Sequence, residues 1–145
     1  YSNTQITNEN VTVTIKANEE IQPVSGWNLS LDKRQLSKTF SANTNTNVAV
    51  RDIAGNESTA KIEINNIDKT NPEIEINYST TSQTIDSVTV TIKANERIQG
   101  IEGWTLSNDE TTLTKVFDEN DTQTVTIRDI EGNTITKSIV VANII

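Results

Sequence analysis

The sequence predicts an all-β protein made of two tandem domains, and two observations carry this prediction. Val11–Glu19 reads VTVTIKANE, and the same residues recur at Val88–Glu96, an offset of 77 positions (88 − 11). Apolar and polar residues alternate along the stretch, which is typical of a half-buried strand rich in β-branched residues. The offset continues without a gap to the end of the chain. Such a repeat indicates two copies of one folding unit.

The domain boundary is predicted at the short segment Asn65–Pro72, which reads NNIDKTNP. With one proline and no glycine, it is expected to be a semi-stiff joint. We therefore predict one domain over residues 1–68 and a second over 69–145. Pro72–Asn77 alternates like a strand, but the first domain has no counterpart before Tyr1. The first strand of that domain is therefore expected to be truncated.

The other expected strands of the first domain are short and are separated by polar turns. Trp27 and Leu29 should share a face of one of them, and Pro23 should lie at its start or on an edge, since it cannot donate to a ladder. Several short strands at this spacing predict a sandwich or a barrel. These strands are Ile21–Leu29, Leu36–Phe40, Asn47–Asp52 and Thr59–Ile67.

Composition argues against several classes of function. The net charge of −8 disfavours nucleic acid and anionic membrane surfaces as partners. No apolar run approaches the ~20 residues that a membrane span needs. The chain has neither cysteine nor histidine, so it lacks disulfides, thiolate metal sites and the commonest general base. No nucleophile has a recognisable base, and we expect no enzyme.

The repeated motifs resemble a known family. Each unit carries VTVTI, then NE, Gly-Trp, Leu-x-Lys-x-Phe and Asp-x-x-Gly-Asn, and the joint carries Ile-Asp-x-Thr-x-Pro. This pattern is similar to the bacterial immunoglobulin-like (Big-type) tandem repeats of Gram-positive surface and secreted proteins. The resemblance implies two immunoglobulin-like β-sandwich domains in a stalk, spacer or adhesin. It names no ligand, because such folds serve many functions.

One motif in each repeat has the chemistry of a hairpin turn. Aspartate at the first turn position caps backbone N–H groups, and glycine at the fourth accepts a positive φ. Turn chemistry explains every residue, although a ligand or metal role for the aspartate remains an alternative. The predicted turn residues are Asp52, Gly55, Asn56, Asp129, Gly132 and Asn133.

The tryptophans and the strand lysines leave alternatives open. Trp27 and Trp104 are predicted to lie in the core, since immunoglobulin-like cores commonly bury a tryptophan, but each also suits a sugar-stacking platform. Lys38 and Lys115 share the parity of inward residues. A partly buried Lys–Asp pair, a Lys–Asn isopeptide bond and a lysine that snorkels from an edge strand are all compatible with that parity.

The joint is also a candidate calcium site. In an immunoglobulin-like sandwich, several loops meet where the chain enters the second domain, and carboxylates would gather there. Ca²⁺ takes six to eight oxygen ligands in irregular cages. Nearby lysine and arginine residues offer ordinary surface ion pairs as the alternative. The candidate ligands are Asp68, Glu96, Asp129 and Glu131.

These observations predict a non-catalytic structural spacer in the exposed part of a bacterial cell-surface or secreted protein. Its partners would be neighbouring repeats of the same chain. The alternative is an adhesive or carbohydrate-binding module that contacts a polysaccharide or a host surface protein. Apart from possible calcium, no cofactor is expected.

Overall fold

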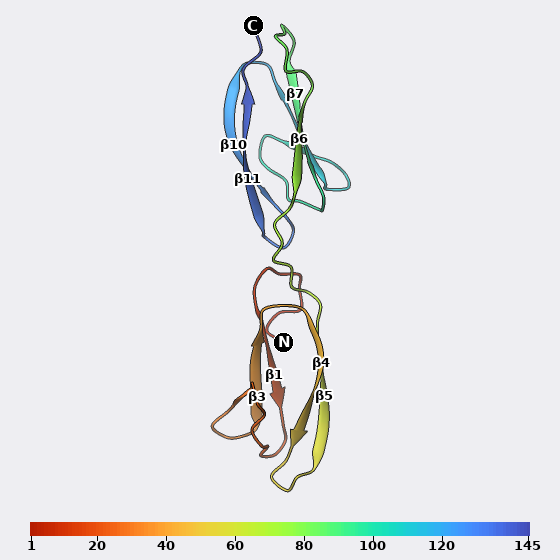
Figure 1. Cartoon of the computed structure of the whole chain (residues 1–145), viewed down its shortest axis with the longest axis vertical. Helices are drawn as coiled ribbons and strands as arrows, with labels where there is room; N and C mark the ends of the chain where they lie inside the picture. The colour runs from red at the N-terminus through yellow and green to blue at the C-terminus, as the bar shows by residue number, and fades with distance from the viewer. The chain divides into compact units, whose positions relative to one another are not determined.

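A computed structural model describes all residues, 1–145, and confirms the all-β prediction: it contains no helix and several antiparallel sheets. The chain divides into two compact units, Tyr1–Lys69 (unit 1) and Thr70–Ile145 (unit 2). This division lies one residue beyond the predicted boundary. In Figure 1, unit 1 runs from red to yellow and unit 2 from green to blue.

Unit 1 contains two antiparallel sheets whose inward side chains meet in one core. One sheet has the order β1-β3-β2, and the other pairs β4 with β5. The core combines Val11 and Val13 of the first sheet with Val48, Ile62 and Ile64 of the second. The strands are β1 (Val11–Lys16), β2 (Asn28–Leu29), β3 (Gln35–Phe40), β4 (Thr44–Arg51) and β5 (Glu57–Ile64).

Unit 2 has the same strands and one more. Its larger sheet has the order β6-β7-β9-β8, and β10 pairs with β11. The additional strand is β6, which the alternation of Pro72–Asn77 predicts. The strands are β6 (Ile74–Tyr78), β7 (Val88–Ala94), β8 (Thr105–Leu106), β9 (Thr112–Phe117), β10 (Asp121–Arg128) and β11 (Thr134–Val141).

The strand pairing of unit 1 recurs in unit 2 at the offset of the sequence repeat. Val11 lies opposite Phe40, and Val88 opposite Phe117. Val48 lies opposite Ala60 in the β4–β5 hairpin, and Val125 opposite Lys137 in the β10–β11 hairpin. The isolated bridges Thr7–Ile67 and Thr84–Ile144 also correspond. Equivalent residues therefore occupy equivalent backbone positions in both units.

The predicted strand Ile21–Leu29 is wrong for most of its length. Only Asn28–Leu29 pairs as a strand, and Ile21 forms a single bridge to Asp52. Between them, the Trp27 N–H donates to the Val24 carbonyl, and Gly26 has a φ of 81°. A tight turn interrupts the strand because Gly26 readily adopts a conformation that other residues resist.

Each unit also has a tyrosine that links its opening segment to its last strand. The Tyr1 hydroxyl accepts a hydrogen bond from the Glu63 N–H, and the Tyr78 hydroxyl accepts one from the Val140 N–H. In unit 2 this contact joins β6 to β11 and so connects the two sheets. The structure has no helix long and apolar enough to cross a membrane.

Candidate functional site

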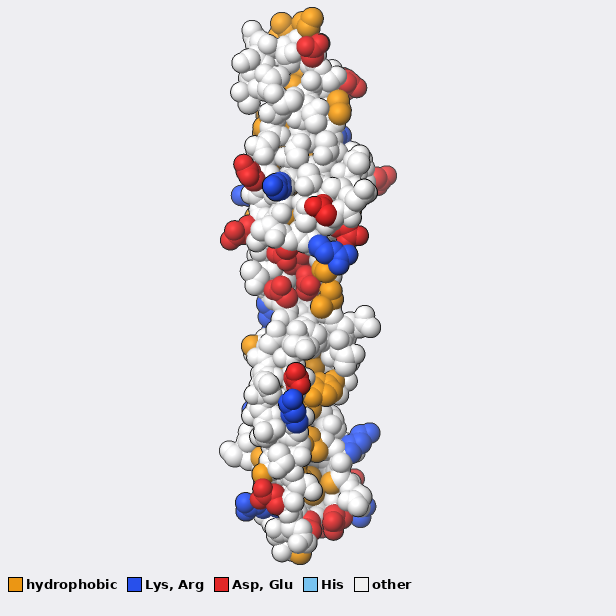
Figure 2. Space-filling view, turned by 90° about the vertical axis from the view of Figure 1, so that its right-hand side faces the viewer, with side chains coloured by type: hydrophobic (Ala, Val, Ile, Leu, Met, Phe, Trp, Pro, Cys, Tyr) orange, Lys and Arg blue, Asp and Glu red, His pale blue; other side chains and the backbone are white.

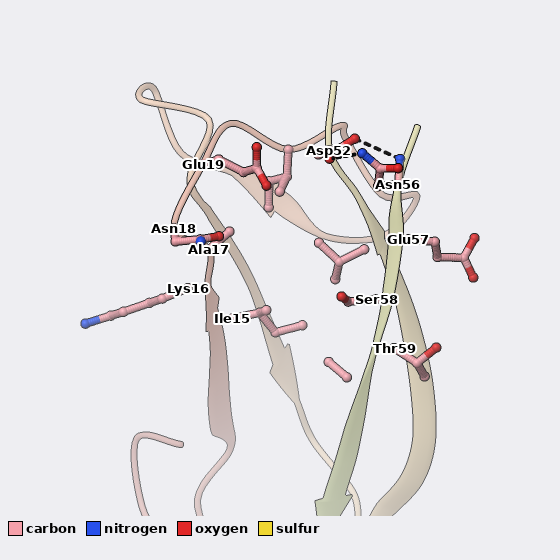
Figure 3. A pocket seen from close by; sticks show the side chains of 13 residues that line it. Ile15, Lys16, Ala17, Asn18, Glu19, Asp52, Asn56, Glu57, Ser58 and Thr59 are labelled. Carbon is pink, nitrogen blue, oxygen red and sulfur yellow. Dashed lines mark hydrogen bonds between the residues drawn. The ribbon is translucent and has the colours of Figure 1, made fainter. Parts of the chain in front are cut away.

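The most prominent hollow of unit 1 is a groove between β1 of one sheet and β5 of the other, with a volume of about 440 Å³. Its floor is apolar, because Ile15, Val50 and Ala60 project from strands on both sides. Figure 3 shows Ile15 directed into the space between β1 and β5, with Lys16 pointing away from it. The groove therefore offers a narrow apolar floor beside a strand edge.

The rim of the groove is polar, and its aspartate is hydrogen-bonded within a turn. Asn18 and Glu19 follow β1, and Asp52 and Asn56 belong to the β4–β5 turn. The Asp52 carboxylate accepts hydrogen bonds from the Asn56 N–H and from Asn56 Nδ2, both at 2.8 Å. The Asn56 amide, helped by backbone N–H groups of the turn, lowers the pKa of Asp52 below its ordinary value. An anionic carboxylate held in this way serves the turn and is a poor proton acceptor.

The corresponding turn in unit 2 is more buried. Asp129 is fully buried, and its Oδ1 accepts hydrogen bonds from the N–H groups of Gly132 at 2.7 Å and Asn133 at 2.8 Å. Its Oδ2 accepts one from Asn133 Nδ2 at 2.9 Å. Gly132 has a φ of 102°, and Gly55 a φ of 94°. All six predicted turn residues thus lie in two turns with the hydrogen bonds that the motif suggests.

A glutamine beyond the predicted motif supports each turn. Gln22 Nε2 donates to the Asp52 carbonyl at 2.9 Å, and Gln99 Nε2 donates to the Asp129 carbonyl at 2.8 Å. Sequence reasoning missed these residues. The sequence hint was that a glutamine follows an isoleucine at the same place in both repeats. The aspartate that each glutamine supports is too distant in the sequence to be identified without the fold.

The tryptophans lie at the margin of the core. Trp27 and Trp104 are partly buried and pack against the buried cluster of their own unit. Trp27 meets the Phe40 ring edge-on, with centroids 6.0 Å apart, and Trp104 meets Phe117 in the same way at 6.2 Å. Such aromatic pairs stabilise a fold beyond their buried area. Because both indoles are only partly buried, part of each remains accessible to solvent.

The proposed Lys–Asp pair is wrong in both units. Lys38 Nζ lies 5.3 Å from the centre of the Phe40 ring, and Lys115 Nζ lies 5.0 Å from that of Phe117. The Asp52 and Asp129 carboxylates are instead held by their own turns. A cation over an aromatic face is favoured by the ring quadrupole, so the phenylalanine ring is the stabilising neighbour of each ammonium group.

The four candidate calcium ligands do not form one group. The Asp129 carboxylate is enclosed by its turn, whereas Glu96 and Glu131 are partly buried and offer carboxylate oxygens within 4.8 Å of each other. Asp68 belongs to unit 1. Calcium binding therefore stays a prediction for Asp68, Glu96 and Glu131, and it is not supported for Asp129, whose carboxylate oxygens are already taken by the turn.

The fold and these sites define an all-β protein whose conspicuous side chains serve turns and packing. No protein-family model, curated protein or solved structure matches the chain.

Proposed function

We propose that the chain is a pair of tandem immunoglobulin-like β-sandwich domains that act as a non-catalytic spacer in a bacterial cell-surface or secreted modular protein. The observation that carries the proposal is the recurrence of the pairing register between units, including the β1–β3 and β7–β9 ladders. Repeated units that each bury their own core are suited to a spacer, because the length of the protein increases with the number of units while the structure of each unit stays the same. Neighbouring repeats would be the main partners.

The distribution of chemistry supports a structural role. Each unit has its own buried cluster, built around Val11 and Phe40 in unit 1 and around Val88 and Phe117 in unit 2. On the face shown in Figure 2, the blue basic atoms are scattered and form no continuous patch. Together with the net charge of −8, this argues against nucleic acid and anionic membrane surfaces as partners.

Single-molecule pulling on the chain, held at both ends, tests the spacer function. We expect two separate unfolding events, each releasing on the order of 20 nm of chain, because a unit of this length extends by about 3.5 Å per residue. Leu113→Ala should lower the force of one event and leave the other unchanged, since Leu113 is fully buried in unit 2. A single event that releases the whole chain would argue against independent load-bearing units.

A binding module for carbohydrate or a host surface protein is the second candidate, and the surface beside Trp27 favours it. Trp27 is partly buried and, with Val24, Lys38 and Phe40, lines a shallow hollow of about 290 Å³. An indole beside an ammonium group suits the apolar face and hydroxyl groups of a sugar. A glycan array with the intact chain, followed by saccharide quenching of tryptophan fluorescence, separates the two functions. The spacer proposal predicts no saccharide-dependent change.

A further inference from the structure

Each unit has a partly buried lysine whose ammonium group forms no ion pair within the protein. Lys38 lies in β3, and Lys115 lies at the equivalent position of β9. Neither takes part in the ion pairs of the structure, although acidic residues outnumber basic ones by 20 to 12. Each ammonium group lies over a phenylalanine ring, and such a contact uses none of its three N–H donors in a hydrogen bond to an anion. These donors are available to an anionic ligand.

In unit 1 this ammonium group lines the hollow beside Trp27. Lys38 and Trp27 form part of its wall, together with residues 46–49 of β4. A side-chain carbon built on Gly26 would lie 3.5 Å from Lys38 Nζ, so the glycine leaves that side of the nitrogen uncovered. Because residues 46–49 include a threonine and an asparagine, the hollow combines aromatic carbon, a positive charge and polar groups.

The hollow continues along β4 into a second hollow of similar size. Each has a volume of about 290 Å³, and the two share Val24, Ser25 and Ala49. Arg51 lines the second hollow and pairs with Glu57 through its Nε atom. We call the two hollows together the trough. Two adjoining shallow hollows, with a basic residue in each, suit an extended anionic ligand better than a compact one.

We propose that the trough of unit 1 binds an acidic polysaccharide, with one uronic acid residue at Lys38. The proposal rests on the second candidate function, a carbohydrate-binding module, and names its class of ligand. The carboxylate of the sugar accepts charge-assisted hydrogen bonds from Lys38 Nζ, which the protein itself does not supply with a carboxylate. The C–H groups of the sugar ring contact the accessible part of Trp27, and its hydroxyl groups meet the polar side chains of β4.

Unit 2 keeps the indole and the ammonium group of this site but adds a negative charge. Ser25 lines both hollows of the trough and is exposed, and its counterpart 77 positions later is the exposed Glu102. A carboxylate at this position repels an acidic sugar. Although Trp104 and Lys115 are present, unit 2 should therefore bind an acidic saccharide more weakly than unit 1.

Titration of the whole chain with acidic oligosaccharides, followed by the indole N–H signals in NMR spectra, tests the proposal. The probes are trisaccharides of galacturonic, mannuronic and glucuronic acid, each compared with its neutral methyl ester. At millimolar concentration, at least one acidic probe should shift the Trp27 signal, and added salt should weaken its binding. Its ester should bind roughly tenfold more weakly. The Trp104 signal, assigned with Trp104→Phe, should respond less.

Substitutions in unit 1, each with a matched control, locate the charge that matters. Lys38→Gln should weaken binding of the acidic probe roughly tenfold, and Lys38→Arg should keep most of it. Lys16→Gln removes an exposed lysine of β1 outside the trough and should change nothing. Ser25→Glu should weaken binding, and Ser25→Gln should not. Because Ser25 is exposed, this second pair does not depend on the packing of the core.

The outcomes separate the class of ligand from the binding function itself. Shifts of the Trp27 signal that require both the acidic probe and Lys38 support the proposal. Equal binding of esters and acids would refute the acidic class while supporting a carbohydrate-binding module. Equal binding of a tetraglutamate peptide would refute a saccharide ligand. No shift with any probe would overturn the proposal together with the binding function, and the pulling experiment tests the spacer function separately.

Discussion

Replacing Asp129 with alanine should destabilise unit 2 strongly. Asp129 is fully buried, and its Oδ1 accepts the N–H groups of Gly132 and Asn133. Hydrogen bonds to a charged acceptor are worth about 1.5–3 kcal/mol each, and a buried donor left without a partner costs about as much. The Gly132 N–H keeps a longer contact of 3.4 Å to the Asp129 carbonyl, which moderates the loss. We therefore expect Asp129→Ala to lower the free energy of unfolding by about 2–4 kcal/mol.

Two matched variants sharpen this prediction. Asp129→Asn keeps an oxygen for both backbone N–H groups and should cost less, about 1 kcal/mol. Asp52→Ala removes the equivalent carboxylate of unit 1, where Asp52 is partly exposed and Asn56 is exposed. Water can satisfy the donors released there, so the loss should be smaller than at Asp129.

Urea unfolding followed by tryptophan fluorescence is the assay. Each unit has one tryptophan, so Trp27→Phe leaves Trp104 as the reporter of unit 2, and Trp104→Phe leaves Trp27 as the reporter of unit 1. The Asp variants are compared within these backgrounds. Equal midpoint shifts for Asp129→Ala and Asp52→Ala would refute the reasoning from burial.

Two further predictions follow from the cores and the turns. Leu36 and Leu113 are equivalent residues, and both are fully buried. Replacing either with alanine should lower the free energy of unfolding of its own unit by about 2–5 kcal/mol. A single substitution that shifts the urea transitions of both units would contradict separate cores. Hydrogen bonds lower the folded pKa of Asp32, Asp52 and Asp109, led by Ser30, Asn56 and Ser107 respectively. The stability that these three carboxylates contribute is complete above the unfolded pKa of about 3.9 and is lost as pH falls through the folded pKa values. The urea midpoint of unfolding should therefore be constant from pH 7 to about 5 and decrease below about pH 4. The decrease should be less steep in Asp52→Asn.

The sequence predicts best what local chemistry decides. Alternation predicts β1 and β7, and the Asp-x-x-Gly-Asn motif predicts turns in which Gly55 and Gly132 have positive φ. The expected strand Ile21–Leu29 fails for a local reason as well, because the turn at Gly26 interrupts it. The aspartate turn was predicted from residues within five positions of one another, whereas its glutamine supports lie about 30 positions away.

The failed Lys–Asp prediction shows the limit of reasoning from strand parity. Parity places Lys38 and Lys115 inward, but parity does not choose between a carboxylate and an aromatic ring as the partner. The partner of each lysine is the phenylalanine two positions along the same strand, Phe40 or Phe117. The turn aspartates are hydrogen-bonded within their own turns. An inward lysine in a strand therefore predicts a nearby stabilising group, without specifying its type.

The repeated stretch VTVTIKANE shows where local sequence stops deciding structure. Ile15 and Ile92 occupy the same place in identical segments, and both lie in strands paired with β3 or β9 in the same register. Ile92 is nevertheless fully buried, whereas Ile15 is partly exposed in a groove. The local sequence determines the strand and the direction of the side chain, but a neighbouring strand determines whether that side chain is covered. In unit 2 this neighbour is β6, whose Ile76 lies opposite Ile92, so the burial of that isoleucine depends on a strand outside the repeated segment.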